Sequence, residues 1–226
     1  MCGRFQLSVK GKQISERFNV EVFDEFYKPN YNCAPSQKLP VITNTEQHKL
    51  SYFKWGLIPF WAKDPRIGFK LINTRSETIL EKPSFKNAFK KRRCLIPANG
   101  FYEWKKDKNK TPYRIFLKSE AIFSMAGIWE TWKDAEERPI HSFSIITTKP
   151  NDLMESIHNR MPVILSPENE KQWLNNDDEK ILKKLFIPFE SAKMDAHTIS
   201  KRVNTPKNNA EEIILPVEYN NKDTLF

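Results

Sequence analysis

The chain has 226 residues, of which 39% are hydrophobic and 12% aromatic, with a net charge of +9 and 3 cysteines. This composition is typical of a folded domain and excludes an intrinsically disordered chain. No apolar run is long enough for a secretory signal or a bilayer span, so we expect a cytoplasmic protein without membrane contact. An odd number of cysteines without a close pair argues against a disulfide framework.

The predicted strands are rich in β-branched or aromatic residues and end at Pro, Asn or charged residues. They are expected at 52–58, 93–104, 113–118, 122–129, 142–148 and 162–165. Short helices are expected after the capping residues Ser84, Asn151, Ser166 and Asp177. Because the strands do not alternate with long helices, the pattern predicts an α+β fold. We expect a single domain built on a mainly antiparallel, partly barrel-like β-sheet with short peripheral helices.

The positive charge is concentrated in one stretch of the chain. Between Lys82 and Lys118 there are 12 Lys or Arg residues but only two acids, Glu103 and Asp107. A localised basic field attracts polyanions, among which nucleic-acid phosphates are the commonest. A solubilising surface is the alternative. Charge alone leaves both interpretations open.

The N-terminal sequence Met-Cys-Gly-Arg-Phe indicates a specific chemistry. Aminopeptidases remove an initiator Met that precedes a small residue, and Cys2 would then carry an α-amine and a thiol on adjacent carbons. Their ordinary pKa values, about 7.7–8.0 and about 8.5, leave unprotonated fractions near neutral pH. An aldehyde condenses with such an amine to a Schiff base, which the thiol closes to a thiazolidine. Alternatively, Cys2 is an incidental small residue, as Cys33 and Cys94 are expected to be.

Six motifs occur in an order that resembles the SRAP family (SOS-response-associated peptidase domain). They are MCGRF at 1–5, YNCAPSQ at 31–37, WGLIPFWAKD at 55–64, INTRSET at 72–78, RRCLIPANGFYEW at 92–104 and IHNRMPVIL at 157–165. Members of this family process abasic sites by DNA–protein crosslinking. The resemblance implies an SRAP-like domain over 1–216 and a short C-terminal tail over 217–226.

The resemblance also implies the catalytic residues. Cys2 would attack the ring-opened aldehyde of an abasic site, and Asn73 would hydrogen-bond near the Cys2 terminus. Glu103 and His158 would flank the sugar and move protons. In strand alternation Glu103 shares a face with Phe101, and a carboxyl in such an aromatic setting would resist ionisation. The alternatives are a surface ion pair for Glu103 and a helix cap or core hydrogen bond for His158.

The DNA-binding residues implied by the resemblance are Arg4 and Arg75 as phosphate clamps and Arg160 with less support. Trp55 and Trp61 are candidates for base stacking, although core packing is the competing interpretation. The expected partner is single-stranded DNA containing abasic sites, bound by a monomer. Neither a metal nor an organic cofactor is expected, because the aldehyde is already electrophilic.

Other interpretations of Cys2 remain open at this point. An N-terminal-nucleophile amidohydrolase also begins with Cys-Gly, and a peptidase of that kind could release its own initiator Met. A non-covalent binder of single-stranded nucleic acid would make Cys2 irrelevant. A zinc site formed by the three cysteines is disfavoured by their spacing. One departure from the family pattern is Asn159, where Asp often follows the His.

Overall fold

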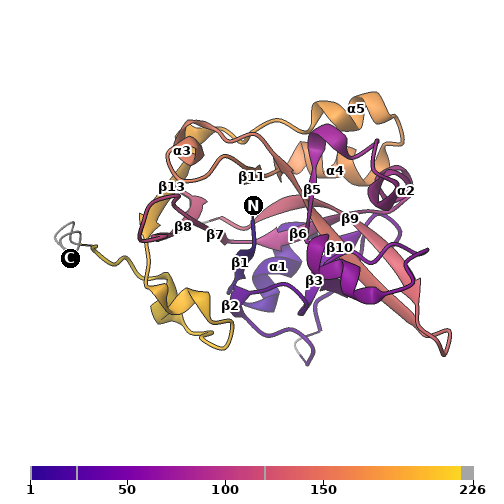
Figure 1. The fold of residues 1–226 in the computed structure, drawn as a ribbon, viewed down its shortest axis with the longest axis horizontal. Coiled ribbons are helices and arrows are strands. Elements are labelled where there is room, and N and C mark those ends of the chain that lie inside the picture. The colour runs from indigo at the N-terminus through magenta and orange to yellow at the C-terminus, as the bar shows by residue number, and fades with distance from the viewer. Residues whose placement is uncertain (1, 24, 120, 220–226) are drawn as a thin grey trace.

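The structure is a computed structural model that describes residues 2–23, 25–119 and 121–219 (Figure 1). Its first sheet has five strands in the order β13-β8-β7-β1-β2. These are β13 (Met194–Thr198), β8 (Pro112–Leu117), β7 (Gly100–Trp104), β1 (Arg4–Leu7) and β2 (Asn30–Cys33). The N-terminal strand β1 therefore lies inside the sheet, paired with β7 on one edge and β2 on the other.

The second sheet closes on itself. Its strands are β11 (Met161–Pro162), β10 (Pro139–Thr148), β4 (Ser51–Trp55), β3 (Lys38–Thr43), β6 (Arg93–Ala98), β9 (Phe123–Lys133) and β12 (Ile164–Leu165), with β5 (Asn73–Arg75) beside β10. Because β10 also pairs with β9, the strands β10, β4, β3, β6 and β9 form a barrel-like ring. Most pairs are antiparallel, and β10 pairs in parallel with β4 and β5. The predicted α+β class and partly barrel-like sheet are confirmed.

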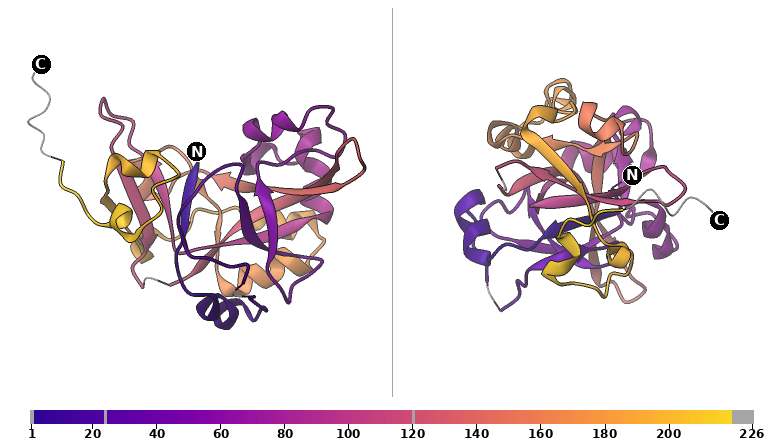
Figure 2. Two further views of the ribbon diagram at one scale, coloured as in Figure 1. Left: turned by 90° about the horizontal axis from the view of Figure 1, so that it is seen from below. Right: turned by 90° about the vertical axis from the view of Figure 1, so that its left-hand side faces the viewer.

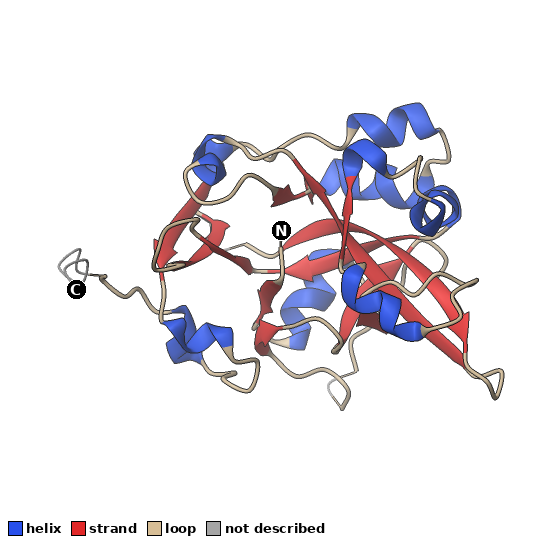
Figure 3. Ribbon diagram, in the orientation of Figure 1, coloured by secondary structure: helices blue, strands red, loops and turns tan. Residues whose placement is uncertain are grey.

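Short helices surround the sheets (Figure 3). The α-helices are α1 (Gly11–Phe18), α2 (Pro83–Lys91), α3 (Asp152–Glu155), α4 (Pro167–Asn175) and α5 (Glu179–Lys184). The 3₁₀ helices are η1 (Pro65–Lys70), η2 (Ser76–Thr78), η3 (Ser191–Lys193), η4 (Lys201–Asn204) and η5 (Glu211–Ile214). Within the described part of the chain, no helix combines the length and apolarity needed to cross a membrane.

Two of the four predicted helix caps are confirmed. Asn151 and Ser166 accept hydrogen bonds from the backbone of α3 and α4, respectively. The cap at Ser84 is wrong, because α2 already begins at Pro83, whose fixed φ and missing N–H suit a first helical position. The cap of α5 is not Asp177 but its neighbour Asp178.

The predicted strand over 93–104 is in fact two strands in different sheets. Asn99 separates β6 from β7, and its side chain accepts a hydrogen bond from the Ser8 backbone at 2.9 Å. The chain thus passes from the barrel into the five-stranded sheet at this residue. Strand β7 then pairs with the edge of β1, so that Arg4 lies opposite Tyr102 and Phe5 opposite Phe101.

A close approach of two glycines shapes the loop between β4 and β5. Gly56 has φ of 121°, a conformation that side chains rarely adopt. A Cβ atom at Gly56 would lie 2.6 Å from the Gly68 carbonyl oxygen, so the backbone of η1 approaches only because no side chain intervenes. The loop that carries Trp61 is therefore held against the barrel.

Part of the predicted C-terminal tail packs on the domain. The Val217 amide donates to the Thr198 carbonyl at 2.9 Å, and the Tyr219 hydroxyl donates to the Ile199 carbonyl at 2.7 Å. Residues 220–226 lie outside the described residues.

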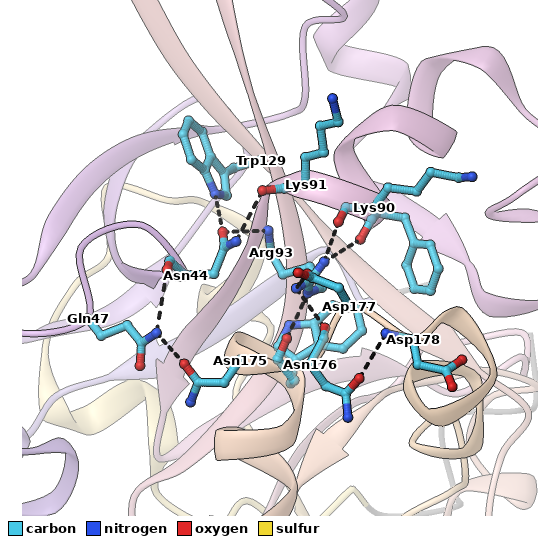
Figure 4. A network of polar contacts seen from close by, with 12 residues as sticks. Asn44, Gln47, Lys90, Lys91, Arg93, Trp129, Asn175, Asn176, Asp177 and Asp178 are labelled. Atoms are coloured by element: carbon cyan, nitrogen blue, oxygen red, sulfur yellow. Dashed lines mark hydrogen bonds and ion pairs between the residues drawn. The ribbon is translucent and has the colours of Figure 1, made fainter.

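A buried arginine joins two helix ends to the barrel. Arg93 is 1% exposed, and Figure 4 shows its guanidinium at the centre of a polar network. Its acceptors are the carbonyls of Phe89, Lys90, Trp173 and Asn176 and the carboxylate of Asp177, at 2.6–3.1 Å. The last carbonyls of a helix lack intrahelical partners. Arg93 therefore completes the ends of both α2 and α4.

Replacing Arg93 with Met should lower the free energy of unfolding by about 3 kcal/mol, because the buried carbonyls would lose their donors. Urea unfolding of the two proteins measures this difference. The matched control is Lys91→Met, which removes an exposed cation two residues away and should change stability by less than about 0.5 kcal/mol. Equal effects of the two substitutions would contradict the role of Arg93.

Candidate functional site

Cys2 precedes the central strand β1 and is completely buried in the chain that carries Met1. Figure 1 draws the start of β1 between β7, with which β1 pairs, and β5, whose Asn73 binds the Cys2 carbonyl. Burial raises the pKa of the Cys2 thiol, and the charge of Glu103 raises it further. The thiol is therefore protonated at neutral pH, and Glu103 lies within electrostatic range of it.

Asn73, at the start of β5, contacts Cys2 directly. Its Nδ2 donates to the Cys2 carbonyl oxygen at 2.8 Å, while its Oδ1 is buried without a hydrogen-bond partner among the described residues. Strand β5 reaches this position because it pairs with β10, where Asn73 lies opposite Ile145. The hydrogen bond expected near the Cys2 terminus is present in the structure, and its part in catalysis stays a prediction.

Trp55 is a core residue that links the strands of the site. It is 1% exposed, and its ring lies 5.2 Å from that of Phe5 in β1. Its Nε1 donates to the carbonyl of Ile72, the residue before Asn73, at 2.9 Å. A ring with no exposed face cannot stack on a base, so the structure supports the core-packing interpretation of Trp55 instead of base stacking.

Glu103 lies near the end of β7 on the same face as Phe101. The residue is 2% exposed, and this burial raises the pKa of its carboxyl from 4.5 to about 7. Continuing the β1–β7 register by one residue places Glu103 opposite Gly3, next to Cys2. A carboxyl with this pKa exists in both forms at neutral pH, which suits a group that both accepts and donates a proton.

His158 follows α3 directly, as the sequence predicts, and is half-buried. The Arg160 amide donates to its Nδ1 at 3.1 Å, a contact that favours the neutral tautomer with its proton on Nε2, and the Arg160 carbonyl lies 3.3 Å from the same nitrogen. Burial lowers the pKa of the imidazole, with a smaller contribution from the charge of Lys106. His158 is therefore neutral near pH 7.

Arg160 connects the His158 loop to the neighbouring strands. Its guanidinium pairs with Glu77 at 2.6 and 2.9 Å and donates to the Thr147 carbonyl at 2.6 Å. These contacts occupy one edge of the guanidinium and hold the start of β11 against β10. Arg160 therefore has a structural role, and its contact with DNA stays a prediction.

Arg4 and Asn32 hold the C-terminal segment against β1. Arg4 donates to Asn32 Oδ1 and to the carbonyls of Val203 and Asn204 at 2.7–3.0 Å. Asn32 is buried and donates to three carbonyls of the same segment, those of Val203, Thr205 and Asn208. The motif YNCAPSQ therefore has a structural use at Asn32 that the sequence did not reveal. The expected phosphate contact of Arg4 is not tested by these bonds.

Arg75 and Trp61 are the predicted DNA-binding residues with free surface. The Arg75 side chain is exposed, and it forms none of the ion pairs or side-chain hydrogen bonds found within the described part of the chain. Trp61 is 49% exposed and lines a groove of about 1280 Å³ with Phe60, Trp129 and Trp132. Phe69, which no sequence motif indicated, is 59% exposed on the same loop. These rings provide stacking surfaces for unpaired bases.

The basic stretch between Lys82 and Lys118 does not form one surface patch. Arg93 and Arg114 are buried, while Arg92 pairs with Glu130 and Lys90 with Glu179. The exposed lysines that remain lie in three places: in α2 and at its N-cap Lys82, in the turn that joins β7 to β8, and at Lys118 after β8. The excess of basic residues counted in this stretch of the sequence is therefore larger than the positive charge that gathers at any one place on the surface.

The remaining cysteines belong to other strands, Cys33 opposite Phe5 at the end of β2 and Cys94 in β6. Cys33 and Cys94 are free and buried, as predicted. Among the described residues, no group of three or more His, Cys, Asp or Glu side chains could hold a metal ion.

Comparison with known proteins gives consistent matches over the chain. The family model described as SOS response associated peptidase (SRAP) matches residues 1–206. The abasic site processing protein YoqW of Bacillus subtilis (strain 168) is 50% identical over 221 residues, which cover 95% of this chain and 99% of that protein. The abasic site processing protein HMCES of Xenopus tropicalis is 31% identical, with coverages of 84% and 67%. A crystal structure of a protein from Bacteroides thetaiotaomicron has a TM-score of 0.89 at 33% identity, covering 96% of this chain and 100% of that one.

The raised pKa of Glu103 predicts a pH dependence of stability. Between its ordinary value of 4.5 and about 7, the folded state retains a proton that the unfolded state has lost. Stability should therefore fall as the pH rises through this window, by about 3 kcal/mol in total, and stay level above it. Urea unfolding at pH 4.5–8 of the parent and Glu103→Gln measures the difference. A carboxyl ¹³C resonance titrating below pH 5 would contradict the burial effect.

Proposed function

Because the chain belongs to the SOS response associated peptidase (SRAP) family, we propose that it processes abasic sites by crosslinking Cys2 to single-stranded DNA. The relatives named above are abasic site processing proteins. The observation that carries the proposal is the position of Cys2, whose carbonyl is held by Asn73 beside a carboxyl with a pKa of about 7. Removal of Met1 would place an α-amine at this position.

The first step of the proposed reaction is imine formation. The neutral Cys2 amine attacks the sugar aldehyde, and ionised Glu103 accepts a proton from the nitrogen as the C–N bond forms. The carbinolamine hydroxyl then leaves as water, protonated by Glu103, and the neutral imidazole of His158 orients it by hydrogen bonding. One water is released, and the imine joins Cys2 to the DNA. A pKa near the working pH lets Glu103 serve in both proton transfers.

Ring closure makes the adduct durable. The Cys2 sulfur adds to the imine carbon and its proton passes to the nitrogen, which gives a five-membered thiazolidine without further loss of atoms. While the imine persists, removal of a proton from the adjacent sugar carbon would expel the 3′ phosphate, so lyase activity is a side reaction. The raised pKa of the thiol favours this amine-first route over a peptidase reaction, in which a thiolate would attack.

Arg75 and the exposed rings would hold the strand. Arg75 is the predicted phosphate clamp with an exposed side chain, and Trp61 offers half its surface for stacking. Arg4 also fixes β1 to the C-terminal segment through its hydrogen bonds to Asn32, Val203 and Asn204. Splayed, unpaired bases suit such stacking surfaces better than a duplex does. We therefore assign single-stranded DNA as the substrate.

Substitutions at Cys2 should separate the roles of its two groups. With single-stranded DNA containing one abasic site, Cys2→Ser should form a denaturation-resistant adduct only after borohydride reduction, because its hydroxyl closes the imine at most to an oxazolidine, which hydrolyses readily. The parent protein should give a denaturation-resistant band without reduction, and Cys94→Ala, which changes another buried thiol, should match the parent. A stable band from Cys2→Ala would rule out the mechanism.

Any residue retained before Cys2 should abolish the stable adduct, because the nitrogen would lie within a peptide bond. A chain with one extra N-terminal Gly should still bind abasic single-stranded DNA to within about threefold, since phosphate and stacking contacts are untouched. Mass spectrometry verifies the N-terminus, and a denaturing gel measures the adduct. An undiminished adduct from the extended chain would refute attack by the α-amine.

A further inference from the structure

Four exposed lysines form a compact positive turn next to Glu103. They are Lys105, Lys106, Lys108 and Lys110, and we call residues 105–110, between β7 and β8, the lysine loop. Within the described residues, none of the four takes part in an ion pair, in contrast to Lys90 and Arg92 of the same basic stretch. Unpaired, hydrated ammonium groups are the ones available to release phosphate counterions.

The backbone of the lysine loop is fixed by its own hydrogen bonds. The Lys105 amide donates to the Thr111 carbonyl at 2.9 Å, which closes the turn. Asp107 accepts from the Thr111 amide at 3.2 Å and from its hydroxyl at 3.1 Å. The carboxylate of Asp107 is thus used inside the loop. The turn presents its cations from a preorganised backbone, which lowers the entropic cost of binding a polyanion.

The lysine loop lies on the same face as the N-terminus. Figure 2 (left) shows the N-terminus between the turn that joins β7 and β8 on one side and the purple segment that contains η1 on the other. The charge of Lys106 acts on both Glu103 and His158, which places this lysine within electrostatic range of the two proton-transfer groups. The opposite, purple side holds β5, which ends at Arg75, and the segment around η1, which follows Trp61 in the sequence.

We propose that the lysine loop binds the phosphates of the single strand on one side of the abasic nucleotide, opposite the side held by Arg75 and Trp61. This assignment rests on the proposed function for the identity of the bound strand. It divides the DNA contacts into two halves, with the reactive terminus between them. The occupant is a phosphodiester backbone, because four of the six residues of the loop are lysines, which offer point charges to phosphates, and none is aromatic.

The test compares two variants of equal charge. One changes Lys105, Lys106, Lys108 and Lys110 to Gln, and the control makes the same change at the exposed Lys171, Lys180, Lys183 and Lys184 of α4 and α5. Both are made in a Cys2→Ala background and tested with a fluorescent oligonucleotide that carries a tetrahydrofuran abasic analogue. This analogue has no aldehyde, so only non-covalent binding is measured. We expect about tenfold weaker binding for the loop variant. The slope of log K against log salt should become shallower by about 0.7 for each phosphate that the loop no longer binds. The control should stay within about twofold of its parent.

Shortened oligonucleotides test the one-sided geometry. With the strand cut back to the abasic nucleotide on one side, the decrease in affinity caused by the loop substitutions should disappear, and with the other side cut back it should persist. A decrease that survives both truncations, or an equal decrease in the control variant, would overturn the assignment. So would weak binding by the matching Lys→Arg loop variant, which keeps the charge.

The two proposals fail separately. Crosslinking is measured with the Cys2-containing protein, whereas strand binding is measured without the thiol. A protein that shows the one-sided loop effect but forms no adduct would refute the proposed chemistry and support the loop assignment. Normal crosslinking of the loop variant at saturating DNA, together with unchanged affinity, would refute only the loop assignment.

Discussion

The structure depends on immobilising a chain terminus. Terminal residues of most domains are poorly ordered unless they are tied into a sheet. Here β1 is paired on both edges, with β7 and β2, and the residue two positions before it is held through its carbonyl by Asn73. Trp55 completes the arrangement by packing on Phe5 while it binds the carbonyl next to Asn73. A reaction that uses an α-amine requires this placement, because no other position in a chain has that group.

The electrostatics of the site follow from the same burial. Removing Glu103 from water disfavours its charged form, and the same effect keeps the Cys2 thiol protonated. His158 is shifted in the opposite sense, toward its neutral form, so three groups near the terminus carry less charge than they would in water. Groups of shifted pKa values are typical of functional sites, and they lower the stability of the folded protein, so the barrel core must compensate. Arg93, which a count of charged residues would place on the surface, contributes to that compensation by donating to buried backbone carbonyls.

Much of this could be predicted from the sequence. Strands β8, β9 and β10 are long and apolar, so their existence follows from composition, and the six motifs indicate the family. Strands β1, β2 and β5 have only three or four residues, too few for a periodic signal, and they carry the site. Strand alternation predicted that Glu103 shares a face with Phe101. The position of the Arg4 side chain could not be predicted in this way, because it depends on a hydrogen bond to Val203, which is 199 residues away in the sequence. Side chains such as Arg93 and Arg114 appear as surface charge in a count and become core residues only in three dimensions.

The clamp formed by Arg4 and Asn32 has a consequence for the order in which the molecule is built. Cys2 is held by Asn73, and the strand that follows it is held by residues 100–102 and, through Arg4, by residues 203 and 204. Contacts over such separations form late, after the entropy of closing long loops has been overcome. Strand β1 is therefore fully fixed only after residues 199 and 200 positions beyond Arg4 have folded onto it. Cys2 acquires its surroundings late in folding, although it lies early in the sequence.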